Sequence, residues 1–418
     1  MMDGLSLPMS DTPSNGDPQM SPVSTHPNWL VGNPTLVQQW AALWIGSAGL
    51  LVLGLQPILL GALFSEQRVN FDELALIATA EFIMIALGSI LAATVISTKH
   101  LRIKSATLML LLGVLNYAVS FATTANELLL VRSIAGLVEG GTVAVSIELI
   151  TRCRHTERMG GYFISLQTLA QCALAALLAL WIVPLSGSNG GFNVLAIVCF
   201  ASITVALLVP AEYEKLIKQK DNLDGVFTLR SALALLAIFS FFLFIGSLWA
   251  FLEPLGAQYG IDARHVGMLV SISLGVQVAG AICATLIDRR LDYRVAMIAS
   301  VIAAAGAALT LGNQPSMLGF WVSALVVAFL WMFITPYQIA LTVAADKSRA
   351  TALLLPAAQL LGAALGPIGA SLFIINDDVG AVPYFGVAAL SCSLSASCVL
   401  LILLAGNTVT LDTKDKPY

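Results

Sequence analysis

The chain has 418 residues, of which 58% are hydrophobic and only 11% are charged, and its formal net charge is −4. Soluble domains usually carry about 25% charged residues, so this composition excludes an ordinary soluble enzyme or nucleic-acid-binding domain and indicates a protein that lies in the lipid bilayer. The six cysteines form no CxxC pair and fall mostly in apolar runs, which predicts small buried residues rather than a metal site.

Apolar runs of about 20 residues recur along the chain, and each is long enough to span the bilayer as a helix. The sequence therefore predicts an all-α integral membrane protein with twelve transmembrane helices, at 39–63, 73–96, 106–124, 127–150, 160–183, 192–210, 230–255, 265–287, 294–312, 316–345, 350–374 and 382–405. Residues 1–36 contain no Lys or Arg and no apolar run, which predicts a disordered tail rather than a cleavable signal peptide.

The connecting loops predict the orientation, because cytoplasmic loops are enriched in Lys and Arg. Of the 20 basic residues, seventeen fall on the loops that share a side with the N-terminus, and only Arg68 and Arg264 fall on the opposite loops. We therefore expect a multi-pass protein of the plasma (inner) membrane with both termini in the cytoplasm.

A charged loop after the sixth span divides the chain into two similar halves. Gly88 precedes Arg102 by fourteen residues, and Gly280 precedes Arg294 by the same number, so the two motifs lie 192 residues apart. We predict a cytoplasmic tail (1–36), two pseudo-symmetric six-helix bundles (37–210 and 230–406), a cytoplasmic linker (211–229) and a second cytoplasmic tail (407–418).

The motifs of these halves resemble those of the major facilitator superfamily (MFS) of transporters, over about residues 37–406. The basic loop that this family carries after its second and eighth helices is matched here by Gly88, Lys99, Arg102 and Lys104, and again by Asp288, Arg289, Arg290 and Arg294. The family's R-x-x-x-G motif of helix 4 is present as Arg132 to Gly136. The proline–glycine motif of exporters is absent from helix 5 and appears in helix 11, at 362–369.

The resemblance implies alternating access between the two halves, with helices 1, 4, 7 and 10 lining a central cavity. It also implies a cytoplasmic gate, for which we select the loop residues Gly88, Arg102, Asp288, Arg289, Arg290 and Arg294, together with Glu148, Arg152 and Arg158 as gate ion pairs.

Charged residues inside the spans are the strongest functional candidates, because each costs at least about 2.5–3.5 kcal/mol at the centre of a membrane helix. Glu139 falls near the middle of the fourth span, and we expect it to face the cavity and to carry a proton or another cation. Arg132 and Glu81 are further coupling candidates, with a structural ion pair as the alternative. Glu253 precedes a proline near the outer end of the seventh span, where it is either part of a gate or an acid in contact with water.

Uncharged polar and aromatic side chains suggest a binding site for a small molecule. The candidates are Gln56, Trp331, Tyr337 and Gln338. Because the repeat places Glu139 opposite the neighbourhood of Trp331, an acid facing an aromatic ring would suit a cationic or aromatic organic substrate. Gln167, Gln171 and Gln359 are expected to join helices by hydrogen bonds.

We therefore predict a monomeric secondary active transporter of a small organic molecule, driven by protons with sodium as the alternative, with export favoured over uptake. A proton-coupled uptake symporter of an organic acid or metabolite is the second interpretation. A non-transporting sensor on a transporter fold, a membrane enzyme and a channel are the remaining ones. The sequence contains no nucleotide-binding, zinc-protease or serine-hydrolase motif, so neither enzyme activity nor a cofactor or metal is expected.

Overall fold

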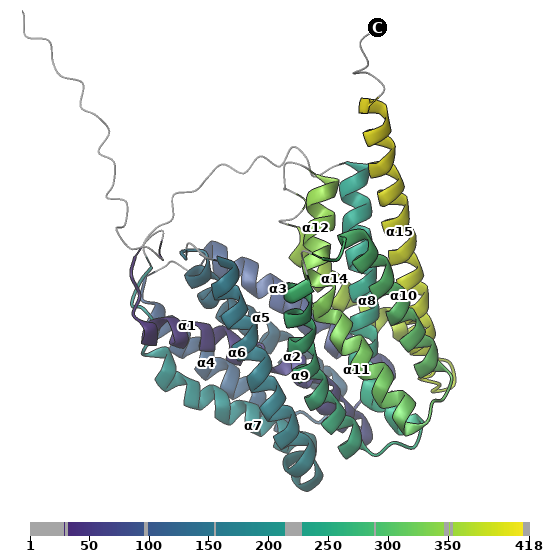
Figure 1. Ribbon diagram of the computed structural model, residues 1–418. Helices are drawn as coiled ribbons and strands as arrows, with labels where there is room; N and C mark the ends of the chain where they lie inside the picture. Colours follow the sequence, from purple (N-terminus) through teal and green to yellow (C-terminus); the bar gives the residue numbers. More distant parts are fainter. Residues whose placement is uncertain are drawn as a thin grey trace, which may run out of the picture.

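The protein is helical throughout the part of the chain that its computed structural model describes (Figure 1). The described residues are 29, 32–95, 99–153, 156–213, 228–287, 290–346, 351 and 354–412. Within them, extended backbone pairing is limited to two isolated bridges, Trp29 with Cys153 and Lys99 with Glu212. The all-helical class expected from composition is confirmed.

The predicted spans correspond closely to the observed helices. The first half contains α1 (Leu36–Gly49), α2 (Leu51–Ser65), α3 (Phe71–Val95), α4 (Leu101–Ala118), the 3-10 turn η1 (Val119–Phe121), α5 (Ala125–Ile150), α6 (Thr156–Leu177), the π-helical segment η2 (Leu178–Ile182) and α7 (Val183–Ala206). The second half contains α8 (Leu229–Gln258), α9 (Ala263–Ile287), α10 (Tyr293–Gly312), α11 (Met317–Phe333), α12 (Thr335–Ala345), α14 (Leu355–Ser371) and α15 (Ala381–Asp412).

Two predicted spans are each built from two helical pieces. The first is interrupted at Leu50, where ψ is 7°, and the tenth bends by 44° between α11 and α12. Pro336 is the second residue of α12, and a proline in the first turn of a helix needs no backbone donor there. The interruption at Leu50 carries no comparable signal in the sequence, so it was not predicted.

Within the described ranges, nine helical stretches are long and apolar enough to cross a membrane, or ten if the bent α11–α12 pair is one span. One of the nine, Met159–Ala206, has 48 residues, about 72 Å at 1.5 Å per residue, which is far more than a hydrocarbon core of about 30 Å. Gly187 breaks this stretch with a φ of 62°, so it holds the fifth and sixth spans. With these two and with α14, which has 17 residues, the fold accommodates the twelve predicted spans.

The two halves repeat each other at the level of single contacts. A side chain on Gly88 would collide with the backbone of Leu137, and one on Gly280 would collide with the backbone of Phe329. The members of the second pair follow those of the first by 192 residues. The same offset relates two more close approaches, Gly54 with Gln171 and Gly246 with Ala363.

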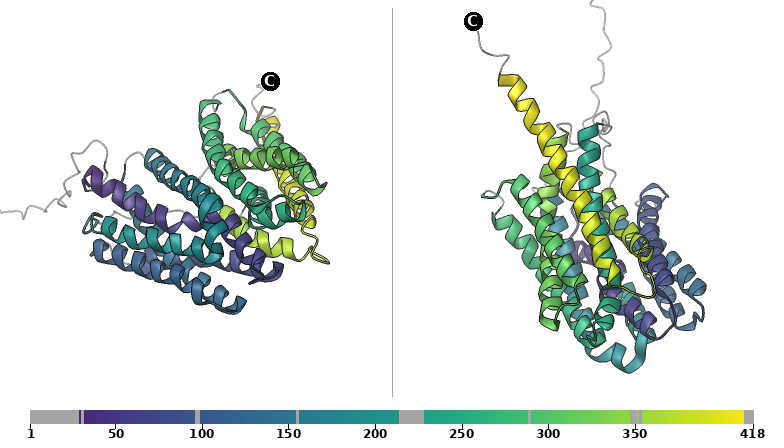
Figure 2. Two further views of the ribbon diagram at one scale, coloured as in Figure 1. Left: turned by 90° about the horizontal axis from the view of Figure 1, so that it is seen from below. Right: turned by 90° about the vertical axis from the view of Figure 1, so that its right-hand side faces the viewer.

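The halves contact each other at their outer ends and diverge toward their inner ends, where inner and outer refer to the predicted orientation. The outer piece of the first span, α2, packs on α8 and α9, whereas its inner piece, α1, packs on α4, α5, α6 and α7 of its own half. In Figure 1 the beginnings of α1 and α8 lie apart, at the left edge and the top, and the views of Figure 2 agree. The structure therefore shows an arrangement that is closed outside.

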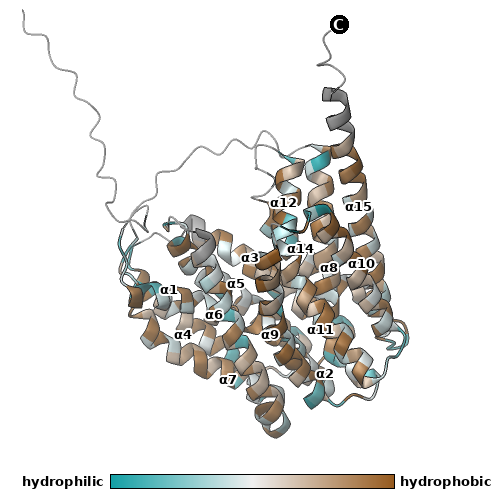
Figure 3. Cartoon of the chain, in the orientation of Figure 1, coloured by the Kyte–Doolittle hydropathy of each residue, from teal (hydrophilic) through white to brown (hydrophobic). Residues whose placement is uncertain are grey.

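The helices of both halves consist mostly of apolar residues along their length (Figure 3). Leu185, Leu286 and Leu372 are each more than 70% exposed, which would be costly in water and is expected for side chains that face lipid. This surface agrees with the multi-pass membrane protein predicted from the sequence.

The predicted domain limits can be compared with the structure only near the ends of the described ranges. Trp29, inside the predicted tail 1–36, is 4% exposed. The predicted linker 211–229 lies largely outside the described residues, as do most of the first tail and the last residues of the second. The last helix, α15, continues to Asp412, and the limit predicted at residue 406 falls inside it.

Candidate functional site

Three charged side chains meet inside the first half, and we call Glu81, Arg132 and Glu139 the charged triad. Arg132 Nη2 donates to Glu81 Oε1 and, over 3.2 Å, to Glu139 Oε1. Each of the three residues is only 1% exposed. The direct pairing of Arg132 with both acids confirms the ion pair that we considered as the structural alternative.

Glycine residues let α3 and α5 approach closely enough to form the triad. A side chain on Gly136 would come within 2.6 Å of the Glu81 carbonyl oxygen, and one on Gly140 would come within 2.5 Å of the Ser89 nitrogen. These residues therefore act in packing, as their spacing predicts.

The remaining walls around the guanidinium come from α4 and α7. Arg132 Nη1 donates to Asn116 Oδ1 over 2.9 Å, and its guanidinium carbon lies 5.2 Å from the centre of the Phe192 ring. Asn116 donates in turn to the Leu112 carbonyl (3.0 Å) and lies 3.9 Å from Cys199 Sγ. Four helices, α3, α4, α5 and α7, therefore hold one cation, and neither Asn116 nor Phe192 was selected from sequence.

The triad contains two carboxyl groups and one guanidinium, so its charges balance only when one proton is present. Glu81 makes the closer contact with Arg132. Glu139 makes the longer one, and its Oε2 atom is buried without a hydrogen-bond partner in the described structure. Because an isolated buried charge is costly, Glu139 is the carboxyl group at which a proton would be bound and released with the least rearrangement.

The position of Glu139 differs from the one expected. Its side chain points into the first half toward Arg132, whereas we expected it to face a cavity between the halves. Trp331, its partner in that expectation, lies in α11 and packs edge-on against Trp249 and Phe242, with centroids 5.6 and 6.5 Å away. The acid and the aromatic ring therefore do not face each other.

The other polar cavity candidates are buried separately. Gln56 in α2 is 1% exposed, and its Nε2 atom has no partner among the described residues. Gln338 in α12 accepts a hydrogen bond from Gln359 Nε2 in α14 over 2.9 Å, and Tyr337 lies 5.3 Å from the Phe333 ring. Gln359 does join helices as predicted, but no hydrogen bond among the described residues connects Gln56 with Gln338, so the structure does not bring these candidates together.

Glu253 lies at the outer contact between the halves, in α8. Neither of its carboxylate oxygens has a hydrogen-bond or ion-pair partner among the described residues, and the residue is 5% exposed. It lines a pocket of about 300 Å³ between α2, α7, α8 and α9. Its role in gating, and the alternative of an acid in contact with water, both stay predictions.

Several gate candidates gather at the inner end of the first half. Arg152 Nη1 donates to Glu148 Oε2 and to the Glu148 carbonyl, the latter over 2.6 Å. Arg102 Nε donates to the Val209 carbonyl over 2.8 Å. The ion pair expected of Glu148 and Arg152 is therefore present, but it joins the last turn of α5 to the residues that follow it and does not connect the halves.

The second basic motif is only partly described. Asp288 and Arg289 lie outside the described residues, and the side chain of Arg158 does as well. Arg290 and Arg294 are exposed, and in the described structure neither forms an ion pair with the first half. Arg294 lies over the ring of its neighbour Tyr293, with its guanidinium carbon 5.6 Å from the ring centre.

Tyr213, which was not selected from the sequence, packs at the inner end of the first half. The guanidinium of Arg152 lies 5.0 Å from the Tyr213 ring centre, and Tyr213 donates to the Val145 carbonyl over 3.3 Å. Burial raises the pKa of the Tyr213 phenol above its ordinary value, although Arg152 opposes this. Trp29 and Tyr213 line the same pocket of about 220 Å³, so segments from both ends of the first half meet here.

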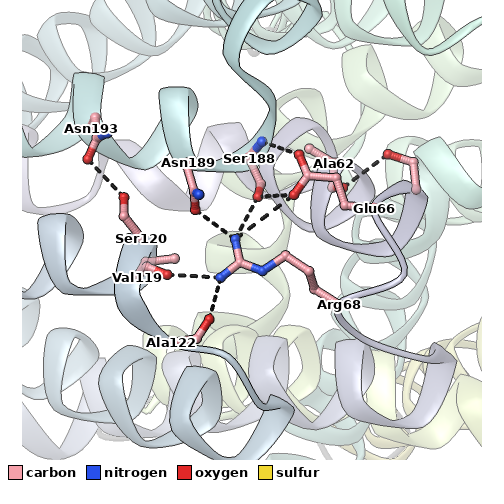
Figure 4. A network of polar contacts seen from close by, with 10 residues as sticks. Ala62, Glu66, Arg68, Val119, Ser120, Ala122, Ser188, Asn189 and Asn193 are labelled. Carbon is pink, nitrogen blue, oxygen red and sulfur yellow. Dashed lines mark hydrogen bonds and ion pairs between the residues drawn. The ribbon is translucent and has the colours of Figure 1, made fainter.

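A second unpredicted network ties the outer ends of the first half together (Figure 4). Arg68 donates to Ser188 Oγ (2.9 Å) and Asn189 Oδ1 (2.7 Å) of α7, and to the carbonyls of Val119 (2.9 Å) and Ala122 (2.7 Å) beside η1. Glu66 accepts from the Ser188 backbone and hydroxyl groups. Only the outside position of Arg68 was visible in the sequence, because its hydrogen-bond partners lie more than fifty residues away.

The described residues include no group of three or more His, Cys, Asp or Glu side chains that could hold a metal ion. The site therefore consists of a buried charged triad in one half and an unpaired carboxylate between the halves.

Apolar helices in two repeated halves, with charged side chains buried among them, define a membrane transport protein. The family model described as the Major Facilitator Superfamily matches residues 42–367. The chain belongs to this superfamily, as its motifs predicted.

Solved structures with the same fold are transporters. A bacterial homolog of the human lysosomal transporter Spinster, in an inward-facing and unoccupied conformation, matches with a TM-score of 0.60 and 15% identity over 90% of this chain and 96% of its own. Two structures of the nucleoside transporter NupG match with TM-scores of 0.67 and 0.64 and identities of 13% and 14%, over 88% of this chain and 99% of theirs. No curated protein sequence matches.

Proposed function

We propose that the protein is a proton-coupled secondary transporter of a small organic molecule that works by alternating access, with Glu139 as the proton-binding group. The observation that carries this proposal is the charged triad, in which one guanidinium faces two buried carboxyl groups. Binding of a single proton neutralises the excess negative charge of the triad, and release of that proton restores the charge. A membrane-embedded acid of this kind is a recognised proton carrier.

The arrangement also divides the roles of the two acids. Glu81 holds the closer contact with Arg132 and acts as its permanent counter-ion. Glu139 keeps one oxygen unpartnered, so it can take up a proton while Arg132 stays paired with Glu81. Asn116 and Phe192 fix the guanidinium from the other side, and they keep it from following Glu139 during the cycle.

The test is transport by the purified protein in liposomes with an imposed pH gradient and an internal pH-sensitive dye. Organic cations, aromatic acids, sugars and nucleosides are added in turn. Wild-type protein is expected to move protons when one compound class is present, and Glu139→Gln is expected to lose this flux while it keeps expression and folding. Undiminished coupled flux in Glu139→Gln would refute the assignment. Flux that needs a sodium gradient instead of a pH gradient would refute proton coupling.

Export remains the proposed direction, and the same vesicles test it. The proline–glycine motif of α14 packs against α8, where a side chain on Gly366 would come within 2.5 Å of the Ser247 nitrogen. The motif is therefore explained by helix packing, and it adds no support for export. Accumulation of the compound against its gradient on the side from which protons leave supports antiport, while accumulation on the side to which they flow supports uptake.

A further inference from the structure

The pocket at the outer contact between the halves holds a carboxylate that the proposed proton pathway does not use. It is lined by residues of both halves: Pro57 and Ile58 of α2, Ala179 of η2, Val183 of α7, Glu253 of α8 and Val266 of α9. Its volume is about 300 Å³, at the lower end of the range for small-molecule sites. Its walls are thus mostly apolar, with one buried acid.

Glu253 has no partner that would explain its burial. No described residue donates a hydrogen bond to either oxygen, and Oε2 is fully enclosed. Buried carboxylates are normally paired with a cation or satisfied by donors. The acid therefore has unused capacity to bind a positively charged group that enters the pocket.

The backbone geometry keeps this acid at the centre of the molecule. Glu253 packs on Gly61, where a side chain would come within 2.6 Å of the Glu253 Cβ atom. These two residues are separated by the repeat offset of 192, so each is the counterpart of the other in the two halves. A contact between counterparts lies on the pseudo-twofold axis, and a ligand held by Glu253 is in contact with both halves.

The charged residues at the rim of the pocket do not act as the positive partner of Glu253. Asp262 is exposed, with its carboxylate 3.9 Å from His265 Nδ1, and Arg264 is exposed beside it. Exposed charges are screened by solvent and ions, and these two have opposite signs. The selectivity of the site therefore depends on Glu253.

We propose that this outer pocket binds an organic monocation, an ammonium group on an apolar body, with Glu253 as its counter-ion. An inorganic metal cation would need several oxygen ligands. Besides the exposed Asp262 and Arg264 at the rim, the pocket is lined by the polar side chain of Ser65, whose hydroxyl already donates to the Ala62 carbonyl over 3.0 Å. An ammonium group with ethyl or larger substituents needs one acid and apolar walls, which the pocket offers.

The site goes beyond the proposed proton pathway, and its test does not depend on transport. The full-length protein in lipid nanodiscs is heated with increasing tetraethylammonium chloride, and sodium chloride is the control at equal ionic strength. A saturable rise in the unfolding temperature is expected for the wild type, for Glu139→Gln and for the rim control Asp262→Asn. Glu253→Gln is expected to bind the probe at least tenfold more weakly, because it keeps the shape of the side chain but lacks its charge.

Three results would overturn the pocket proposal. Equal stabilisation of Glu253→Gln would show that the acid is not the counter-ion. Equal stabilisation by sodium chloride would exclude an organic cation, and no stabilisation of the wild type would exclude the site. If Glu139→Gln binds the probe normally but proton flux is unaffected by that change, the function proposal fails and the pocket proposal holds.

A second measurement needs no variant. The wild-type protein is treated with dicyclohexylcarbodiimide, which modifies carboxyl groups in apolar surroundings, and modified peptides are identified by mass spectrometry. Tetraethylammonium is expected to protect Glu253, while any labelling of Glu81 and Glu139 is unchanged, because these acids lie inside the first half. Labelling of Glu253 that is equal with and without the probe would overturn the proposal.

Discussion

The charged triad predicts an unusual pattern of stability changes when its two acids are replaced. Removing one partner of a buried ion pair typically costs about 3–5 kcal/mol, because a charge is left without compensation. In this triad, Glu81→Gln or Glu139→Gln alone leaves Arg132 with one carboxylate. Each single change should therefore cost only about 1 kcal/mol, close to the value of one hydrogen bond.

The double change Glu81→Gln/Glu139→Gln leaves the guanidinium buried without a carboxylate counter-ion, beside the two introduced amides, Asn116 and the Phe192 ring. Its expected cost is about 3–5 kcal/mol. The double change should therefore exceed the sum of the single changes by about 1–3 kcal/mol, which is within the range measured for coupled residues.

The assay is equilibrium unfolding of the purified variants in mixed micelles with increasing dodecyl sulfate, followed by circular dichroism. Glu139→Gln combined with Glu253→Gln is the matched control, because these acids lie in different halves and should be additive within about 0.5 kcal/mol. Additive costs for Glu81→Gln and Glu139→Gln would refute the idea that they share one cation. A cost for Glu139→Gln alone that equals the double variant would refute the assignment of Glu81 as the permanent counter-ion.

Three further outcomes follow from the contacts. Gly61→Ala should push Glu253 away and favour separation of the outer ends, which spin-label distances across the outer contact would detect as a longer-distance population. Trp249→Phe removes a 3.0 Å hydrogen bond to a carbonyl of α2 that Pro57 leaves without a helical donor. The change should favour the same separation of the outer ends by about 0.5–1.5 kcal/mol. The effect should be smaller in a Pro57→Ala background, because that carbonyl regains its helical donor. Arg68→Lys should lower the free energy of unfolding by about 1.5–3 kcal/mol, because an ammonium group cannot reproduce the fork of hydrogen bonds in Figure 4; dodecyl sulfate unfolding that matches the wild type would contradict this.

The helical class and the approximate positions of the helices were predictable because each span is an apolar run of a fixed minimum length. The internal breaks were less visible. Pro336 gave a signal for the bend before α12, while Leu50 gave none. There the freed carbonyl of Leu50 accepts from Gln171 Nε2 over 2.8 Å, so the interruption depends on a residue more than one hundred positions away.

The members of the charged triad were predictable, because a charge inside a span needs a reason to be there. The direction in which these side chains point was not predictable. The sequence places Glu139 near the middle of a span, but the face of α5 that packs on α3 is set by Gly136 and Gly140 through contacts with another helix. The partner Asn116 was missed because an asparagine in a span has no charge to draw attention, and Trp331 was placed wrongly because its aromatic neighbours lie in other helices.

The buried charged residues of the triad occur in only one half, and this limits how proton binding can be coupled to movement of the other half. The repeat offset of 192 gives Glu81, Arg132 and Glu139 the counterparts Ser273, Ala324 and Trp331, so the second half carries no such charges at these positions. Separation of the outer ends would expose Glu253 on the axis, but it would leave the charged triad inside the first half. A change in the protonation of Glu139 must therefore reach the second half through packed helices. The helix α3 provides the direct route, because it carries Glu81, packs on α5 through closely spaced glycines and also packs on α14 of the second half.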